Sequence, residues 1–127
     1  MSGRQDHRQM QGDRSVVRTR VNDCLVITAP PDLGQGRLQE LERLTIDALC
    51  EQKATAVIFE LTGVNYMDVQ EFHDLRTVAT LVRHLGARTV FVGLRPGIIS
   101  HLVKSDADIS GIQGALGLDD ALALFAV

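Results

Sequence analysis

Histidine and cysteine side chains are the first candidates for chemistry in this sequence. His73 and His84 fall about three turns apart on one predicted helix, which is too far for both to bind one metal ion. Asp74 follows His73 directly, but adjacent helical residues point in different directions, so the two do not form a catalytic pair. Cys24 and Cys50 form no CxxC motif and are expected to be reduced thiols in core or half-buried positions. These residues predict neither a metal centre nor an enzyme.

The segment Gly34-Gln35-Gly36 precedes a predicted helix, where backbone N–H groups could bind a phosphate. A dinucleotide-binding loop would need a further glycine at the position of Gln39, and the chain carries no P-loop motif. We interpret the segment as a plain loop and expect no cofactor.

The junction from Glu60 to Asp68 is more informative, because it joins a short apolar run to the start of a helix through a turn that contains glycine. Asp68 and Glu71 have the spacing of a capping box, in which each side chain accepts a bond from the other residue's backbone. A helix start exposes free N–H donors, so this junction is suited to receive negative charge or to dock on another protein. The alternative is an ordinary strand-to-helix loop.

Alternating strands and helices position this junction. The apolar patterns predict strands over residues 15–21, 24–29, 54–61, 89–93 and, at the edge, 109–115. Helical periodicity and capping signals predict helices over residues 33–51, 68–85, 96–104 and 118–125. Asn22-Asp23 favours a hairpin between the first two strands, and the internal strands recur at the interval of strand–helix–strand units. The predicted fold is α/β with a mainly parallel sheet.

The composition limits the classes of function. A chain of 127 residues with 45% hydrophobic content can bury one modest core, and the polar residues 1–14 are expected to form a flexible tail before a single domain over residues 15–127. The net charge is −3 and the basic residues are scattered, which argues against a nucleic-acid partner. We see no leader sequence and no apolar run near the length of a membrane span, so we expect a cytoplasmic protein without membrane insertion.

The sequence Phe59-Glu60-Leu61-Thr62-Gly63-Val64-Asn65-Tyr66-Met67-Asp68 resembles the signature of the STAS domain of bacterial anti-sigma-factor antagonists. The segments 86–96, 109–112 and 118–122 resemble the stressosome branch of this family, with its small RsbS-type scaffold proteins. The resemblance covers roughly residues 15–127. It implies a mixed sheet of four to five strands with about four helices, no catalytic centre and a function in partner-switching stress signalling.

The resemblance also implies which residues contact partners, namely the loop and first helical turn: Thr62, Gly63, Asn65, Tyr66, Met67, Asp68, Val69, Gln70 and Glu71. The implied partners are STAS-domain paralogues that act as sensor subunits, and a switch serine/threonine kinase or an anti-sigma factor. In the family, a serine or threonine directly after the loop aspartate is phosphorylated. Val69 and Gln70 occupy these positions here, and neither can accept a phosphoryl group, so we expect a fixed docking surface with Glu71 as a nearby negative charge.

Three further possibilities stay open. Phosphorylation could have moved to another hydroxyl, for which the candidates are Thr62, Thr77 and Ser100. The chain could instead serve a lipid ABC transporter or an anion carrier, as other STAS domains do. Val78 and Leu81 widen the apolar stripe of the helix that starts at Asp68, which predicts association with a second copy or with similar domains.

Overall fold

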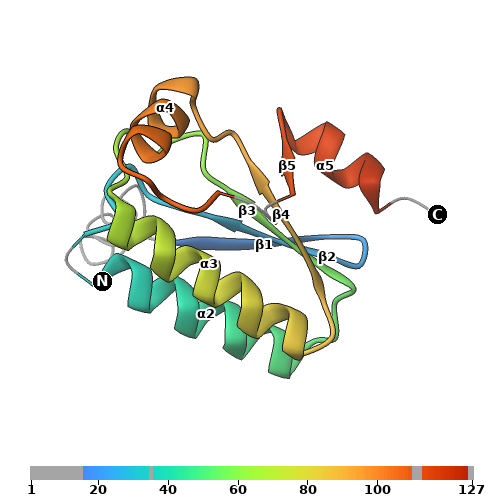
Figure 1. Cartoon of the computed structure of the whole chain (residues 1–127). Coiled ribbons are helices and arrows are strands. Elements are labelled where there is room, and N and C mark those ends of the chain that lie inside the picture. Colours follow the sequence, from blue (N-terminus) through green and yellow to red (C-terminus); the bar gives the residue numbers. More distant parts are fainter. Residues whose placement is uncertain (1–15, 35, 110–112, 126–127) are drawn as a thin grey trace, which may run out of the picture.

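A five-stranded sheet with helices on both faces forms the centre of the protein in the computed structural model, which describes residues 16–34, 36–109 and 113–125 (Figure 1). The predicted tail over residues 1–14 lies outside the described residues, as do residues 110–112 of the predicted edge strand. The fold is the α/β architecture that the sequence predicts.

The sheet is mixed and mainly parallel, as predicted. Its strands, in spatial order, are β1 (Val17–Val21), β2 (Cys24–Thr28), β3 (Ala56–Glu60), β4 (Arg88–Val92) and β5 (Gly114–Ala115). β1 and β2 form an antiparallel hairpin in which Val21 pairs with Cys24, and Asn22 takes the left-handed φ of 54° that the tight turn requires. The pairings of β2 with β3, of β3 with β4 and of β4 with β5 are parallel.

Four helices lie in the described residues: α2 (Arg37–Glu51), α3 (Val69–His84), α4 (Pro96–Lys104) and α5 (Leu118–Leu124). α2 and α3 run side by side over one face of the sheet, and α5 covers part of the other face (Figure 1). α2 begins four residues later than predicted. The Asp32 carboxylate accepts a bond from the Gly34 N–H at 2.8 Å, and Gly36 has a φ of 83°, so the chain turns before the helix can start.

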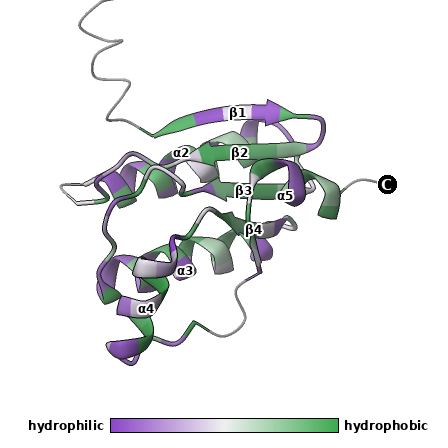
Figure 2. Cartoon of the chain, turned by 90° about the horizontal axis from the view of Figure 1, so that it is seen from above, coloured by the Kyte–Doolittle hydropathy of each residue, from purple (hydrophilic) through white to green (hydrophobic). Residues whose placement is uncertain are grey.

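The core forms on both faces of β3, which explains why this strand reads as a continuous apolar run. Val57 and Phe59 pack toward α2 and α3, whereas Ala56 and Ile58 pack toward α5, and all four side chains are fully buried. The hydropathy colouring of Figure 2 shows that the inner strands are mostly apolar, whereas the outer strand β1 is mostly polar. Phe59 also meets Phe91 edge to face, with ring centres 5.5 Å apart.

Two sequence expectations about side-chain position are corrected by this core. Cys24 is buried, but Cys50 is exposed at the end of α2, and both thiols are free. Val78 is only 1% exposed, because it packs under α3 against the sheet, so it cannot belong to an association surface. Leu81 remains 39% exposed. Of the two residues that widen the stripe of α3, only Leu81 is accessible to a partner.

Candidate functional site

The loop between β3 and α3, residues 61–68, is anchored by apolar side chains at every third position. Leu61, Val64 and Met67 are fully buried in the core, whereas the residues between them face solvent and Tyr66 is 59% exposed. The loop therefore has a fixed inner side and an accessible outer side. Met67, which the sequence predicts as a partner contact, has its side chain buried in the core.

Backbone hydrogen bonds fix the path of the loop. The Leu61 N–H donates to the Val92 carbonyl at 2.8 Å, and the Asn65 N–H donates to the Pro31 carbonyl at 3.1 Å. Within the loop, the Val64 N–H donates to the Leu61 carbonyl at 2.9 Å. The position of the loop thus depends on β4 on one side and on the segment after β2 on the other.

Thr62 lies directly against the chain that leaves β4. Gly93 has a φ of 79°, and a Cβ atom there would stand 2.8 Å from the Thr62 Cα, 2.9 Å from its backbone nitrogen and still closer to its Oγ1. The Arg95 guanidinium donates to the Thr62 carbonyl from Nη2 at 3.0 Å and from Nε at 3.3 Å. Glycine is therefore required at position 93 both by its φ and by the close approach of Thr62.

The start of α3 has the capping box that the sequence predicts. The Asp68 carboxylate accepts a bond from the Glu71 N–H at 2.7 Å, and the Glu71 carboxylate accepts one from the Asp68 N–H at 2.9 Å. Both carboxylates also lie at the positive end of the helix dipole. Asp68 and Glu71 are therefore structural residues of the helix start, whatever else they contact.

Val69 and Gln70, at the positions of the expected phosphoacceptors, form the first exposed turn of α3. Val69 is 37% exposed, and the Gln70 side-chain amide donates to the Asp74 carboxylate at 2.9 Å. An apolar and an amide side chain thus occupy the helix start beside Tyr66.

A shallow hollow of about 230 Å³ separates the loop from α4. Its rim includes Asn65 and Tyr66 from the loop, and Arg95 and His101 from the β4–α4 side. The rings of Tyr66 and His101 lie 5.7 Å apart and are tilted by 45°. The hollow places a cation, an imidazole, a phenol and an amide on one small surface.

The three alternative hydroxyl residues do not share one surface. Thr62 lies in the loop, and Ser100 is exposed on α4 next to His101. Thr77 lies about two turns into α3, where its hydroxyl donates to the His73 carbonyl at 3.1 Å and its side chain borders a recess against α2. Of the three candidates, Thr77 therefore lies away from the loop and the start of α3.

Gly93, Arg95 and His101 belong to the site although the sequence-based site prediction does not include them. Parallel strands bring their carboxyl ends to the same edge of the sheet, so the segment after β4 must lie beside the loop after β3. That rule is the signal that could have identified Gly93 and Arg95. His101 depends on the tilt of α4, which the sequence does not specify.

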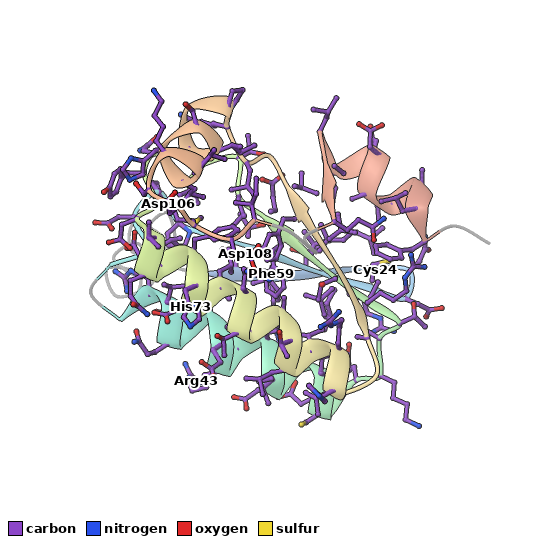
Figure 3. The ribbon with its side chains drawn as sticks, in the orientation of Figure 1. Cys24, Arg43, Phe59, His73, Asp106 and Asp108 are labelled. Atoms are coloured by element: carbon purple, nitrogen blue, oxygen red, sulfur yellow. The ribbon has the colours of Figure 1, made fainter. Side chains whose placement is uncertain are left out.

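His73 and His84 do not line this hollow. His73 is exposed on α3 (Figure 3), and the His84 ring donates from Nδ1 to the Thr80 carbonyl at 2.9 Å near the end of that helix. Among residues 16–34, 36–109 and 113–125, no cluster of three or more His, Cys, Asp or Glu side chains is placed to hold a metal ion. No helix in this part of the chain is long and apolar enough to cross a membrane.

These features define a class of small α/β domain whose exposed surface at the carboxyl edge of a mixed sheet is built from a strand-to-helix loop and the next helix. The model of the STAS domain family matches residues 15–117. The chain belongs to this family.

Relatives and solved structures agree with this assignment. The RsbT co-antagonist protein RsbRA of Bacillus subtilis (strain 168) is 26% identical over 107 residues, which cover 74% of this chain and 39% of that protein. The chain thus spans about two-fifths of the length of this relative. A serine-to-glutamate variant of Moorella thermoacetica RsbS superposes with a TM-score of 0.73 at 19% identity, covering 86% of this chain and 92% of that one.

The same fold occurs in two functional settings. The anti-sigma factor antagonist SpoIIAA in its unphosphorylated form gives a TM-score of 0.68 at 14% identity, covering 89% of this chain and 99% of that one. The murine anion transporter Slc26a9 gives 0.67 at 12% identity, covering 84% of this chain but 18% of that one. The chain is a STAS domain that resembles anti-sigma-factor antagonists and stressosome scaffold proteins.

Proposed function

We propose that this chain is a non-catalytic subunit of a cytoplasmic partner-switching system, which binds STAS-domain paralogues and a switch serine/threonine kinase or anti-sigma factor. The observation that carries the proposal is the exposed first turn of α3, where Val69 and Gln70 stand beside the loop of the family signature. Because neither Val69 nor Gln70 carries a hydroxyl, phosphorylation cannot change the charge at these two positions. We propose that this subunit is always competent to bind and that regulation comes from its paralogues.

The chemistry of this surface fits protein docking. Tyr66 and Val69 offer exposed apolar area, and Arg95 and His101 border the hollow that Tyr66 also lines. A tyrosine and an arginine around a small recess are the side chains that most often dominate the binding energy of protein interfaces. We propose that a partner side chain enters the hollow while the partner backbone crosses the start of α3.

Size-exclusion chromatography with light scattering tests this docking surface. The full chain is measured alone and mixed with each STAS paralogue and switch kinase encoded beside it. We expect a complex that is lost in Val69→Lys and retained in Leu124→Lys, a matched control at an aliphatic residue that is 42% exposed on α5. A strict monomer in every mixture, or equal binding by both lysine variants, would contradict the proposal.

A kinase assay with radiolabelled ATP tests separately whether the start of α3 escapes phosphorylation. We expect the switch kinase to label the new serine of Val69→Ser and to leave positions 69 and 70 of the native chain unlabelled, because Val69 and Gln70 have no hydroxyl to accept a phosphoryl group. Phosphopeptide mass spectrometry of the native chain follows Thr62 and Ser100 in the same reaction. A labelled residue in the native protein would show that regulation has moved to another hydroxyl.

A transporter subunit is the second candidate, and the fold shared with Slc26a9 is the observation that favours it. Neighbouring genes separate the two functions. Permease and ATPase genes would support transport, whereas a switch kinase, a phosphatase and a sensor paralogue would support signalling.

A further inference from the structure

The hollow between the loop after β3 and α4 has a lining whose charge and size select one kind of partner group. Its buried lining residues, Met67 and Ile98, are apolar. The polar side chains of its rim are all exposed: Asn65, Tyr66, Arg95 and His101. The rim therefore determines which polar group of a partner can be recognised here.

The volume of the hollow, about 230 Å³, limits what can occupy it. Pockets that bind cofactors and other small molecules usually have volumes of about 300–1,000 Å³ and enclose most of their ligand. A smaller and shallow hollow suits one side chain of a docked protein better than a separate molecule. The occupant is therefore expected to belong to a protein partner.

Arg95 is held in a defined orientation at the rim. Its Nε and Nη2 atoms donate to the Thr62 carbonyl at 3.3 and 3.0 Å, so this carbonyl occupies one edge of the guanidinium. A guanidinium carries five N–H groups in a rigid fork. The N–H groups on its other edge, from Nη1 and Nη2, have no partner among the described residues. Arg95 thus offers a partner a pair of donors whose direction is already set.

The positive charge of Arg95 is not neutralised by a neighbouring carboxylate. In the part of the chain that the structure describes, the ion pairs are formed by other arginines. Glu60 directs its carboxylate to the Thr62 N–H at 2.6 Å and does not line the hollow. The described lining contains no Asp or Glu, and neither does the first turn of α4. In a chain with a net charge of −3, the hollow is a local excess of positive charge.

The other polar side chains of the rim add donors without acceptors. The Asn65 amide, the Tyr66 hydroxyl and the His101 ring can each donate a hydrogen bond. None of these three side chains has a hydrogen-bond partner within the described residues. A group that only accepts hydrogen bonds and carries a negative charge would satisfy this set.

We propose that the side chain which a partner inserts into the hollow is the carboxylate of an Asp or Glu, and that it pairs with Arg95. This inference rests on the proposed function, because it names the group by which a partner occupies the docking surface. An ionised carboxylate only accepts hydrogen bonds, and it binds a guanidinium through two parallel bonds. A lysine or arginine would be repelled by Arg95, and an apolar side chain would leave the donors without acceptors.

Isothermal titration calorimetry of the full chain with the STAS paralogue or switch kinase encoded beside it measures the dissociation constant. We expect Arg95→Gln to raise this constant about tenfold, because hydrogen bonds to a charged partner are lost. Arg43→Gln makes the same change in net charge and should leave binding unchanged. It is the matched control, since Arg43 is exposed on α2, pairs with Asp47 and does not line the hollow (Figure 3).

A charge-reversal cycle separates the proposed pairing from the bonds that Arg95 makes to the Thr62 carbonyl. Arg95→Glu should weaken the complex more than Arg95→Gln, because two carboxylates would then face each other. Lysine in place of one Asp or Glu of the partner should restore binding to the Arg95→Glu chain. A shifted loop could not be rescued by a substitution in the partner, so rescue identifies a direct charge pair.

The outcomes distinguish this inference from the proposed function. A native complex that is lost in Val69→Lys but keeps its affinity in Arg95→Gln would overturn the carboxylate and leave the proposed function standing. An equal loss in Arg43→Gln, or no rescue by lysine at any exposed Asp or Glu of the partner, would overturn it as well. No complex of the native chain with any of these partners would overturn both.

Discussion

Replacing Gly93 with alanine tests whether the close approach of two chain segments sets the position of the docking loop. The added Cβ would stand 2.8 Å from the Thr62 Cα and 2.9 Å from its backbone nitrogen. The Thr62 hydroxyl can rotate away, but these two backbone atoms cannot. The loop after β3 must therefore move relative to β4, and the bonds from Arg95 to the Thr62 carbonyl must lengthen or break.

Two effects are expected to lower the free energy of unfolding in Gly93→Ala. A left-handed φ costs a residue with a Cβ about 1–2 kcal/mol, and forcing an atom into a filled space costs about 1–3 kcal/mol more. Gly86 separates the two effects, because its φ is 93° and a Cβ there would meet no atom within 4 Å. Gly86→Ala carries only the backbone term, so the difference between the two variants should be about 1–3 kcal/mol.

Urea unfolding followed by circular dichroism gives the free energy of unfolding of both variants. Amide chemical shifts of residues 61–68 report whether the loop moves. We expect Gly93→Ala to be the less stable variant and to shift the loop signals, and Gly86→Ala to leave them unchanged. Equal destabilisation by the two substitutions would refute the reasoning, and so would an unshifted loop in Gly93→Ala.

Two further predictions follow from the site and the core. Asp68→Ala should lower the free energy of unfolding by about 1 kcal/mol, because the capping box is lost; an effect no larger than that of Asp74→Ala, measured by urea unfolding, would contradict it. Iodoacetamide should label Cys50 in the folded protein and Cys24 only after unfolding, as read by peptide mass spectrometry. Burial, and then the charge of Asp23, raises the pKa of the Cys24 thiol, so its reactive thiolate forms only at higher pH. Equal labelling of both cysteines in the folded state would disprove this.

Much of the fold could be predicted from the sequence because its signals are local. The continuous apolar run of β3, the alternating strands and the Asp68–Glu71 spacing each act within a few residues, and the structure confirms them. The start of α2 was misplaced because apolar spacing continues through Leu33, whereas the turn at Gly36 is fixed by backbone geometry. Periodicity does not record such a constraint.

The site was less predictable because it joins two segments about thirty residues apart in the sequence. The exposed side of the loop follows from its spacing, but whether Met67 points outward or into the core depends on how α3 packs. The Arg95 side chain donates a hydrogen bond to the backbone carbonyl of Thr62, and no residue pattern reveals which carbonyl accepts such a bond.

The capping box bears on the expectation that Val69 and Gln70 stand where the family has a phosphoacceptor. Glu71 has the charge that could stand in for a phosphate, but its carboxylate accepts a bond from the Asp68 N–H at 2.9 Å and belongs to the helix start. Phosphorylation would add about −1.5 to −2 charges with three free acceptor oxygens, which a carboxylate engaged in capping does not supply. The surface beside Val69 therefore resembles an unmodified state more than a phosphorylated one. Under the proposed function, a partner that prefers unphosphorylated STAS surfaces should bind this chain, and one that requires the phosphate should not.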